Sequence, residues 1–87
     1  MSTALDQART AYLDAVRARL DADAAVVAAA VECRRVEADP DELPYVADDA
    51  WGASLRARTA AQRAEQRAHV AYEHELYAAT YGHGGRP

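Results

Sequence analysis

The sequence predicts an all-α protein made of two long antiparallel helices. Three observations support this fold class. Twenty-three of the 87 residues are alanine, the strongest helix former. Neither Gly nor Pro interrupts residues 4–39, which is long enough for a helix of many turns. The segment from Asp39 to Pro44 then contains two prolines and divides the chain into two stretches of similar length.

The first helix is predicted from about residue 4 to about residue 38. Thr3 followed by Asp6 resembles a capping box, and the Asp6 carboxylate also suits the positive end of the helix dipole. The larger apolar residues fall on one face, about a third of the helix circumference wide, as expected for an amphipathic helix. These residues are Leu5, Tyr12, Leu13, Val16, Leu20, Val27 and Val31.

The segment from Ala24 to Val31 breaks this pattern because it is apolar on every side of the helix. Such a helix is normally covered on every side, and one antiparallel neighbour cannot do that. A small chain with two alanine-rich helices also buries little surface by itself. We therefore expect the hairpin to assemble into a four-helix bundle, either as a homodimer or with a second protein.

The turn between the helices is predicted over residues 39–44. Asp39 can cap a short helical turn that has Pro40 at its first position, and Pro44 fixes the entry into the second helix. The second helix is predicted from about Tyr45 to Tyr81, and residues 82–87, with three glycines, are expected to form a flexible tail.

Two stripes run along the second helix. Small residues three and four apart form a heptad-like seam, which would allow close helix packing. This alanine seam consists of Val46, Ala50, Ala53, Ala57, Ala60, Ala64, Ala68 and Ala71. A flanking stripe of larger residues consists of Trp51, Arg58, Glu65, His69, Tyr72 and Leu76.

Composition excludes several classes of function. The net charge of −4 argues against a general binder of polyanions. Cys33 is the only cysteine, so the chain has no internal disulfide and no cysteine-cluster metal site, which fits a reducing compartment. No signal peptide is visible, and the longest apolar run, residues 24–31, is too short to span a bilayer. The expected location is cytoplasmic.

A metal site is one alternative. Glu65, His69 and Glu73 are spaced four residues apart on the second helix, and Glu32 could add a ligand from another chain. The layout resembles encapsulated ferritins, whose paired two-helix chains hold two irons through a Glu on the first helix and a Glu-x-x-His motif on the second. Here the motif is Glu-x-x-x-His, and Glu32 faces away from the main apolar stripe. The other interpretation is a pair of ion-paired residues on a solvated flank.

Trp51-Gly52-Ala53 suggests a second alternative. Two helices of matching length with a Trp-Gly pair near the bend resemble the WXG-type hairpins exported by ESX (type VII) secretion. That resemblance implies an exported protein with a helical partner. The glycine that the motif has two positions after the tryptophan is absent, and so is the acidic residue four positions after a C-terminal tyrosine. The structural interpretation is that Trp51 is a large core residue near the turn.

Three further features have both a functional and a structural interpretation. Arg56, Arg58, Arg63 and Arg67 could lie along phosphates, but acidic residues interrupt the patch, which favours a solvated helix with ion pairs. Cys33 has no histidine near it in sequence, which favours a buried small side chain over a reactive thiol.

The third feature is the group of tyrosines at the end of the second helix. Tyr77 and Tyr81 align with Val70 on a face that should otherwise be exposed. They are equally compatible with an outer interface and with packing against Leu5 and Tyr12 at the start of the first helix.

The sequence contains no set of residues typical of a catalytic site, and it predicts no cofactor. We therefore expect a non-enzymatic interaction or assembly module that acts through helix packing, with itself or a second protein as partner. Membrane and nucleic acid are not expected partners. The residues expected at the interface are Leu13, Val16, Leu20, Val27, Val31, Trp51, Tyr72 and Leu76.

Overall fold

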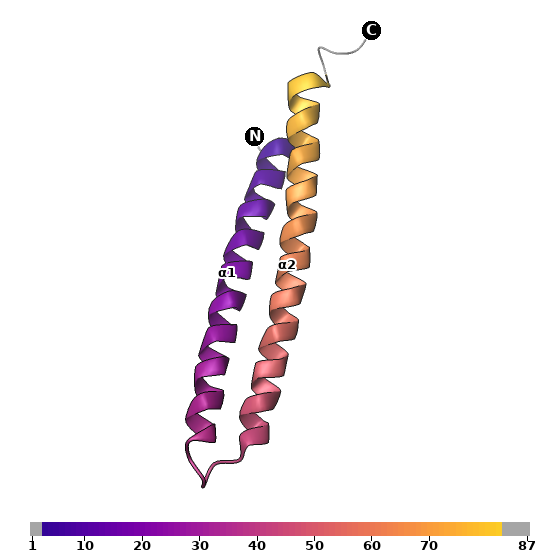
Figure 1. The fold of residues 1–87 in the computed structure, drawn as a ribbon. Helices are drawn as coiled ribbons and strands as arrows, with labels where there is room; N and C mark the ends of the chain where they lie inside the picture. The colour runs from indigo at the N-terminus through magenta and orange to yellow at the C-terminus, as the bar shows by residue number, and fades with distance from the viewer. Residues whose placement is uncertain (1–2, 83–87) are drawn as a thin grey trace.

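The computed structural model of the chain describes residues 3–82, which form two helices and no strand. Helix α1 spans Ala4–Glu37 and helix α2 spans Pro44–Tyr81, and the two run antiparallel, side by side (Figure 1). The molecule measures 72 × 22 × 12 Å. Its radius of gyration of 19.8 Å far exceeds the roughly 12 Å of a compact chain of this length. The predicted helical hairpin is confirmed, and it is a rod with one layer of helices.

The start of α1 is the predicted capping box. The backbone N–H of Asp6 donates to the Thr3 hydroxyl over 3.0 Å, and the backbone N–H of Thr3 donates to the Asp6 carboxylate over 3.5 Å. At the other end, the N–H of Ala38 donates to the carbonyl of Arg34 over 3.2 Å. The helix therefore ends at Glu37, one residue before the predicted boundary.

The connection is a hydrogen-bonded turn. The Asp39 carboxylate accepts from the N–H of Asp41 over 3.0 Å, and its carbonyl accepts from Glu42 over 3.2 Å. The predicted turn is therefore present, with Asp39 as its cap and Pro40 at its first position. Helix α2 begins at Pro44, one residue earlier than predicted, since proline at the first helical position needs no hydrogen-bond partner. Residues 83–87 of the predicted tail lie outside the described residues.

The face of α1 that contacts α2 follows an unbroken heptad pattern, with steps of three and four residues. We call this face the α1 seam. It consists of Leu5, Ala8, Tyr12, Ala15, Arg19, Ala22, Val26, Ala29, Cys33 and Val36, all buried or half-buried. Only one edge of the apolar face predicted for this helix meets α2, and Leu13, Leu20, Val27 and Val31 remain exposed.

On α2, most of the alanine seam does not face α1. Val46, Ala50, Ala53, Ala57, Ala60 and Ala71 are exposed, and only Ala64 and Ala68 are half-buried. The face that contacts α1 instead carries much of the predicted flanking stripe. It consists of Ala47, Trp51, Ser54, Arg58, Ala61, Glu65, Ala68, Tyr72, Glu75 and Ala78. The physical reason is that long half-polar side chains cover more of the facing helix with their stems than a methyl group can.

The core of the hairpin is small and lies near the connection. Cys33, Val36 and Ala47 form its buried cluster, and Val26 is the other buried apolar residue in the described part of the chain. No large side chain among residues 3–82 is fully enclosed. Within the same residues, no helix is apolar over a stretch long enough to cross a bilayer. Two helices alone thus leave most of their large apolar side chains exposed.

Candidate interaction surface

Four large apolar residues are exposed on the side of α1 that α2 does not cover. We call Leu13, Leu20, Val27 and Val31 the outer stripe. Their exposed fractions are 58%, 53%, 63% and 59%, respectively. The first three each follow directly after a residue of the α1 seam, and one residue turns an α-helix by about 100°. The outer stripe therefore points sideways out of the hairpin, where a further helix can reach it.

The expected interface residues divide between two surfaces. Val16 and Tyr72 are half-buried within the hairpin, where the Tyr72 ring stacks on Tyr12 with centroids 5.8 Å apart. Trp51 and Leu76 are both about 40% exposed at the edges of the contact between the helices. The four residues of the outer stripe are the part of the predicted set that remains available to another molecule.

Arg19 fixes the two helices relative to each other halfway along the hairpin. Its Nε donates to Glu65 of α2 over 2.7 Å, and one terminal nitrogen donates to Asp23 over 2.9 Å. The hydrogen bond to Glu65 and, to a smaller degree, the hydrogen bond to Asp23 raise the pKa of the Arg19 guanidinium above its ordinary value. This ion pair crosses the seam in one specific position, so it sets the register of α1 against α2.

The four residues considered for a metal site do not come together in one chain. Glu65 is held by Arg19 halfway along the hairpin. Glu32 forms an ion pair of two hydrogen bonds with Arg35 near the C-terminal end of α1. His69 and Glu73 are paired over 2.9 Å, and the His69 ring packs on Tyr12 with centroids 5.2 Å apart. Among residues 3–82 no three His, Cys, Asp or Glu side chains form a group suitable for a metal ion.

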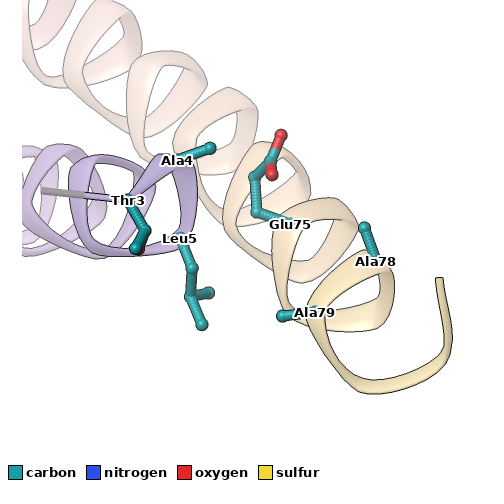
Figure 2. A pocket seen from close by; sticks show the side chains of 6 residues that line it. All are labelled: Thr3, Ala4, Leu5, Glu75, Ala78 and Ala79. Carbon is teal, nitrogen blue, oxygen red and sulfur yellow. The ribbon is translucent and has the colours of Figure 1, made fainter. Parts of the chain in front are cut away.

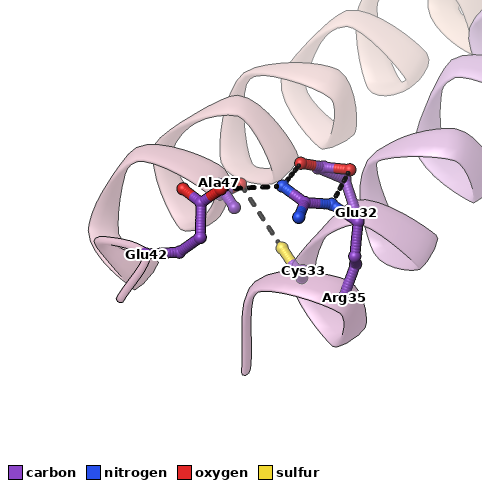
Figure 3. Close-up of polar contacts among 5 residues, drawn as sticks. All are labelled: Glu32, Cys33, Arg35, Glu42 and Ala47. Atoms are coloured by element: carbon purple, nitrogen blue, oxygen red, sulfur yellow. Dashed lines mark hydrogen bonds and ion pairs between the residues drawn. The ribbon is translucent and has the colours of Figure 1, made fainter. Parts of the chain in front are cut away.

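Cys33 is a buried structural residue near the connection (Figure 3). Its Sγ donates to the carbonyl of Ala47 over 3.3 Å and lies 3.7 Å from the Asp48 carboxylate. Burial, reinforced by the negative charge of Asp48, raises the pKa of the Cys33 thiol. Because the thiolate is the nucleophile, this environment makes Cys33 unreactive.

Arg35 ties the end of α1 to the connection beside Cys33 (Figure 3). Its guanidinium donates to Glu32 over 3.0 and 2.6 Å and to Glu42 over 3.4 Å. The hydrogen bonds from Arg35 lower the pKa of Glu32. These residues serve the turn and are not free for another ligand.

The Trp-Gly pair does not lie at the bend. Trp51 and Gly52 are in the second and third turns of α2, and Gly52 has an ordinary helical conformation with no positive φ. Trp51 lies beside Ala30, Cys33 and Arg34 of α1. The pair therefore acts as part of the helix contact, without a role in forming the turn.

The arginines of α2 do not form one patch. Arg58 lies in the contact with α1, where its Nε is buried without a hydrogen-bond partner among the described residues. Arg56, Arg63 and Arg67 are exposed, and Arg56 and Arg63 border a shallow hollow with Leu55. Arg58 is therefore separate from the other three, which are spaced seven and four residues apart and share one exposed face of α2.

The open end of the hairpin has a small apolar hollow between the two helices (Figure 2). It is lined by Thr3, Ala4, Leu5, Glu75, Ala78 and Ala79. Tyr77 and Tyr81 are exposed and pack on each other, with ring centroids 4.8 Å apart. Of the two predicted arrangements, the structure favours tyrosines on the outer surface over tyrosines packed against the start of α1.

Comparison of the chain with protein-family models, with curated proteins and with solved structures finds no match. Function is therefore inferred from the residues and the geometry alone.

The alignment of Asp6 and Arg34 with the outer stripe was not predicted from the sequence. Asp6 and Arg34 follow directly after the seam residues Leu5 and Cys33, so both lie on the line of the outer stripe. The signal that could have identified them is a seven-residue repeat: positions 6, 13, 20, 27 and 34 all fall on this line.

Proposed function

We propose that this chain is a non-enzymatic protein–protein interaction module that completes a four-helix bundle through one face of α1. The observation that carries the proposal is the outer stripe, whose members all keep more than half of their surface exposed. Exposed apolar strips of this length mark interaction sites in proteins. The small core of the isolated hairpin supports the same conclusion, since assembly would add the burial that two helices cannot supply.

The dimensions of α1 fit such a role. Its 34 residues make a helix roughly 51 Å long, with a contact strip about 10 Å wide. Covering that strip on two partners buries on the order of 1,000 Å², about the minimum for a specific interface. The lone buried thiol of Cys33 fits the reducing, cytoplasmic setting that we propose for this module.

Replacement of valine by threonine tests the proposal with little change in shape. Val27→Thr together with Val31→Thr puts hydroxyl groups into the outer stripe, and Val70→Thr, at a residue of α2 that is 56% exposed, is the matched control. Light scattering over a range of concentrations measures association. The double substitution should weaken association at least tenfold, because each hydroxyl loses its water on burial, and Val70→Thr should leave it unchanged. A wild-type chain that is monomeric and unfolds cooperatively would overturn the proposal.

A further inference from the structure

We infer that the occupant of the outer stripe is a second copy of this chain, whose α1 lies antiparallel to the first, with the two-fold axis near Leu20. This inference rests on the proposed function and identifies the partner. It follows from the order of residues along the stripe, from the charges at its ends and from the position of Leu20 in α1.

Three residues of the outer stripe, Leu13, Leu20 and Val27, lie on one line that is symmetric about Leu20, and Val31 lies beside this line. Leu13 and Val27 lie seven residues on either side, and Asp6 and Arg34 lie fourteen residues on either side. Leu20 is also within one residue of the midpoint of α1, which spans Ala4–Glu37. An antiparallel pair centred there therefore overlaps both helices along their whole length. Leu20 then meets Leu20, and Leu13 meets Val27 of the second copy.

The charges favour this antiparallel arrangement. Asp6 of one copy lies opposite Arg34 of the other, so each contact has an ion pair at both ends. Arg34 has no ion-pair partner within residues 3–82 of its own chain, and Asp6 has only the exposed Arg9, 3.7 Å away. A parallel pair would instead place Asp6 against Asp6 and Arg34 against Arg34, which is repulsive.

The helix ends support the same orientation. The first turn of α1 contains the acidic residue Asp6, and its last turn contains the basic residues Arg34 and Arg35. In α2, the first turn contains no acidic residue and the last turn contains no basic residue. In the antiparallel pair, the basic end of each α1 lies beside the acidic end of the other. At the level of Leu20, which the Arg19–Glu65 ion pair fixes, the exposed residues of α2 are all polar or charged: Gln62, Arg63, Gln66 and Arg67. Helix α1 is therefore a better match for α1 than α2 is.

Cysteine cross-linking tests both the partner and the register. Cys33→Ser removes the native thiol and keeps a donor for the Ala47 carbonyl. Single cysteines are then introduced as Leu13→Cys, Leu20→Cys, Val27→Cys and, on another face, Ala28→Cys, and a short bis-maleimide links nearby thiols. The full chain is used, and circular dichroism checks that each variant remains helical.

The antiparallel pair predicts three results. Leu20→Cys chains cross-link to each other, because this position lies on the two-fold axis. Leu13→Cys chains alone do not, since their thiols are about 21 Å apart along the helix. A mixture of Leu13→Cys and Val27→Cys chains gives covalent dimers, and Ala28→Cys chains remain single.

Other results would overturn the inference in distinguishable ways. Self-cross-linking of Leu13→Cys chains would mean a parallel pair, and a dimer in which Leu20→Cys fails to cross-link would place α1 against another helix. Either result contradicts the register proposed here but leaves an interaction module in place. A chain that stays monomeric, with no cross-link at any position, would contradict the second copy as partner. If it also unfolds cooperatively, it contradicts the proposed function itself.

Discussion

Replacement of Leu20 by glutamate should dissociate the assembly, because this residue contributes twice to a contact centred on it. Leu20 is 53% exposed in the single chain, so covering the remainder contributes roughly 1 kcal/mol per copy. Two carboxylates brought within about 8 Å near the two-fold axis repel each other by roughly 2 kcal/mol at an effective dielectric constant near 20. Together these effects amount to roughly 4 kcal/mol, or about a thousandfold in Kd.

Ala18→Glu is the control for this substitution. Ala18 is exposed, lies two residues before Leu20, and therefore points about 200° away around the helix. Sedimentation velocity over a concentration series measures Kd, and circular dichroism measures helix content. Leu20→Glu should be monomeric at concentrations where the wild type and Ala18→Glu are assembled. An unchanged Kd for Leu20→Glu, or an equal loss for Ala18→Glu, would refute the placement of the contact on the outer stripe.

Three further predictions concern the hairpin itself. Arg58→Leu should stabilise the hairpin by about 1 kcal/mol, because the buried Nε of Arg58 lacks a hydrogen-bond partner in the described chain. This corresponds to a rise in Tm of roughly 4–8 °C. Thermal unfolding measures the change, with Arg56→Leu at an exposed position as the control, and a lower Tm for Arg58→Leu would contradict the prediction. Gly52→Ala should also stabilise α2, by roughly 0.5–1 kcal/mol. An added Cβ meets only the flexible end of the Arg56 side chain, at 3.4 Å. Urea unfolding at fixed protein concentration measures the change, and destabilisation would show that the space around Gly52 is not free. The raised pKa of Cys33 makes the folded state favour the protonated thiol. The resulting stabilisation is complete below the ordinary thiol pKa and is lost as the pH rises through the raised value. Iodoacetamide should therefore alkylate Cys33 more slowly in the folded chain than in urea at pH 8 to 9, and equal rates would contradict the buried position.

The ends of the helices were predictable because local chemistry determines them. Thr3 and Asp6 satisfy each other's backbone groups at the start of α1. Pro44 begins α2 at the position where a missing N–H costs nothing. These effects act within a few residues, so they do not depend on which faces of the helices later meet. Both helix boundaries at the connection lie within one residue of the predicted positions for this reason.

The pairing of the faces was less predictable, because alanine gives little hydrophobic contrast around a helix. On α2 the alanine seam has the stronger apolar pattern, but it faces solvent over most of its length. The actual contact includes Arg58, Glu65 and Tyr72, whose long side chains cover more of α1. Hydrophobicity alone could not identify Arg19 as a residue of the contact, because Arg19 depends on Glu65 of the other helix for its position.

The outer stripe was partly predictable. Its four residues were expected at an interface because they are large and apolar. Which side of α1 meets α2 and which side remains exposed became clear only from the structure. The apolar middle of the helix shows this division. Val26 is buried against α2, and the adjacent Val27 remains 63% exposed. One neighbouring helix therefore covers only Val26, Ala29 and Ala30 of the segment from Ala24 to Val31.

Sedimentation equilibrium of the wild-type chain, combined with its thermal unfolding curve, tests most directly whether the outer stripe is an assembly surface. The proposed antiparallel pair predicts a mass approaching twice the 9.4 kDa of one chain, with a Tm that rises with protein concentration. A constant mass of one chain, together with cooperative unfolding at a Tm independent of concentration, would contradict it.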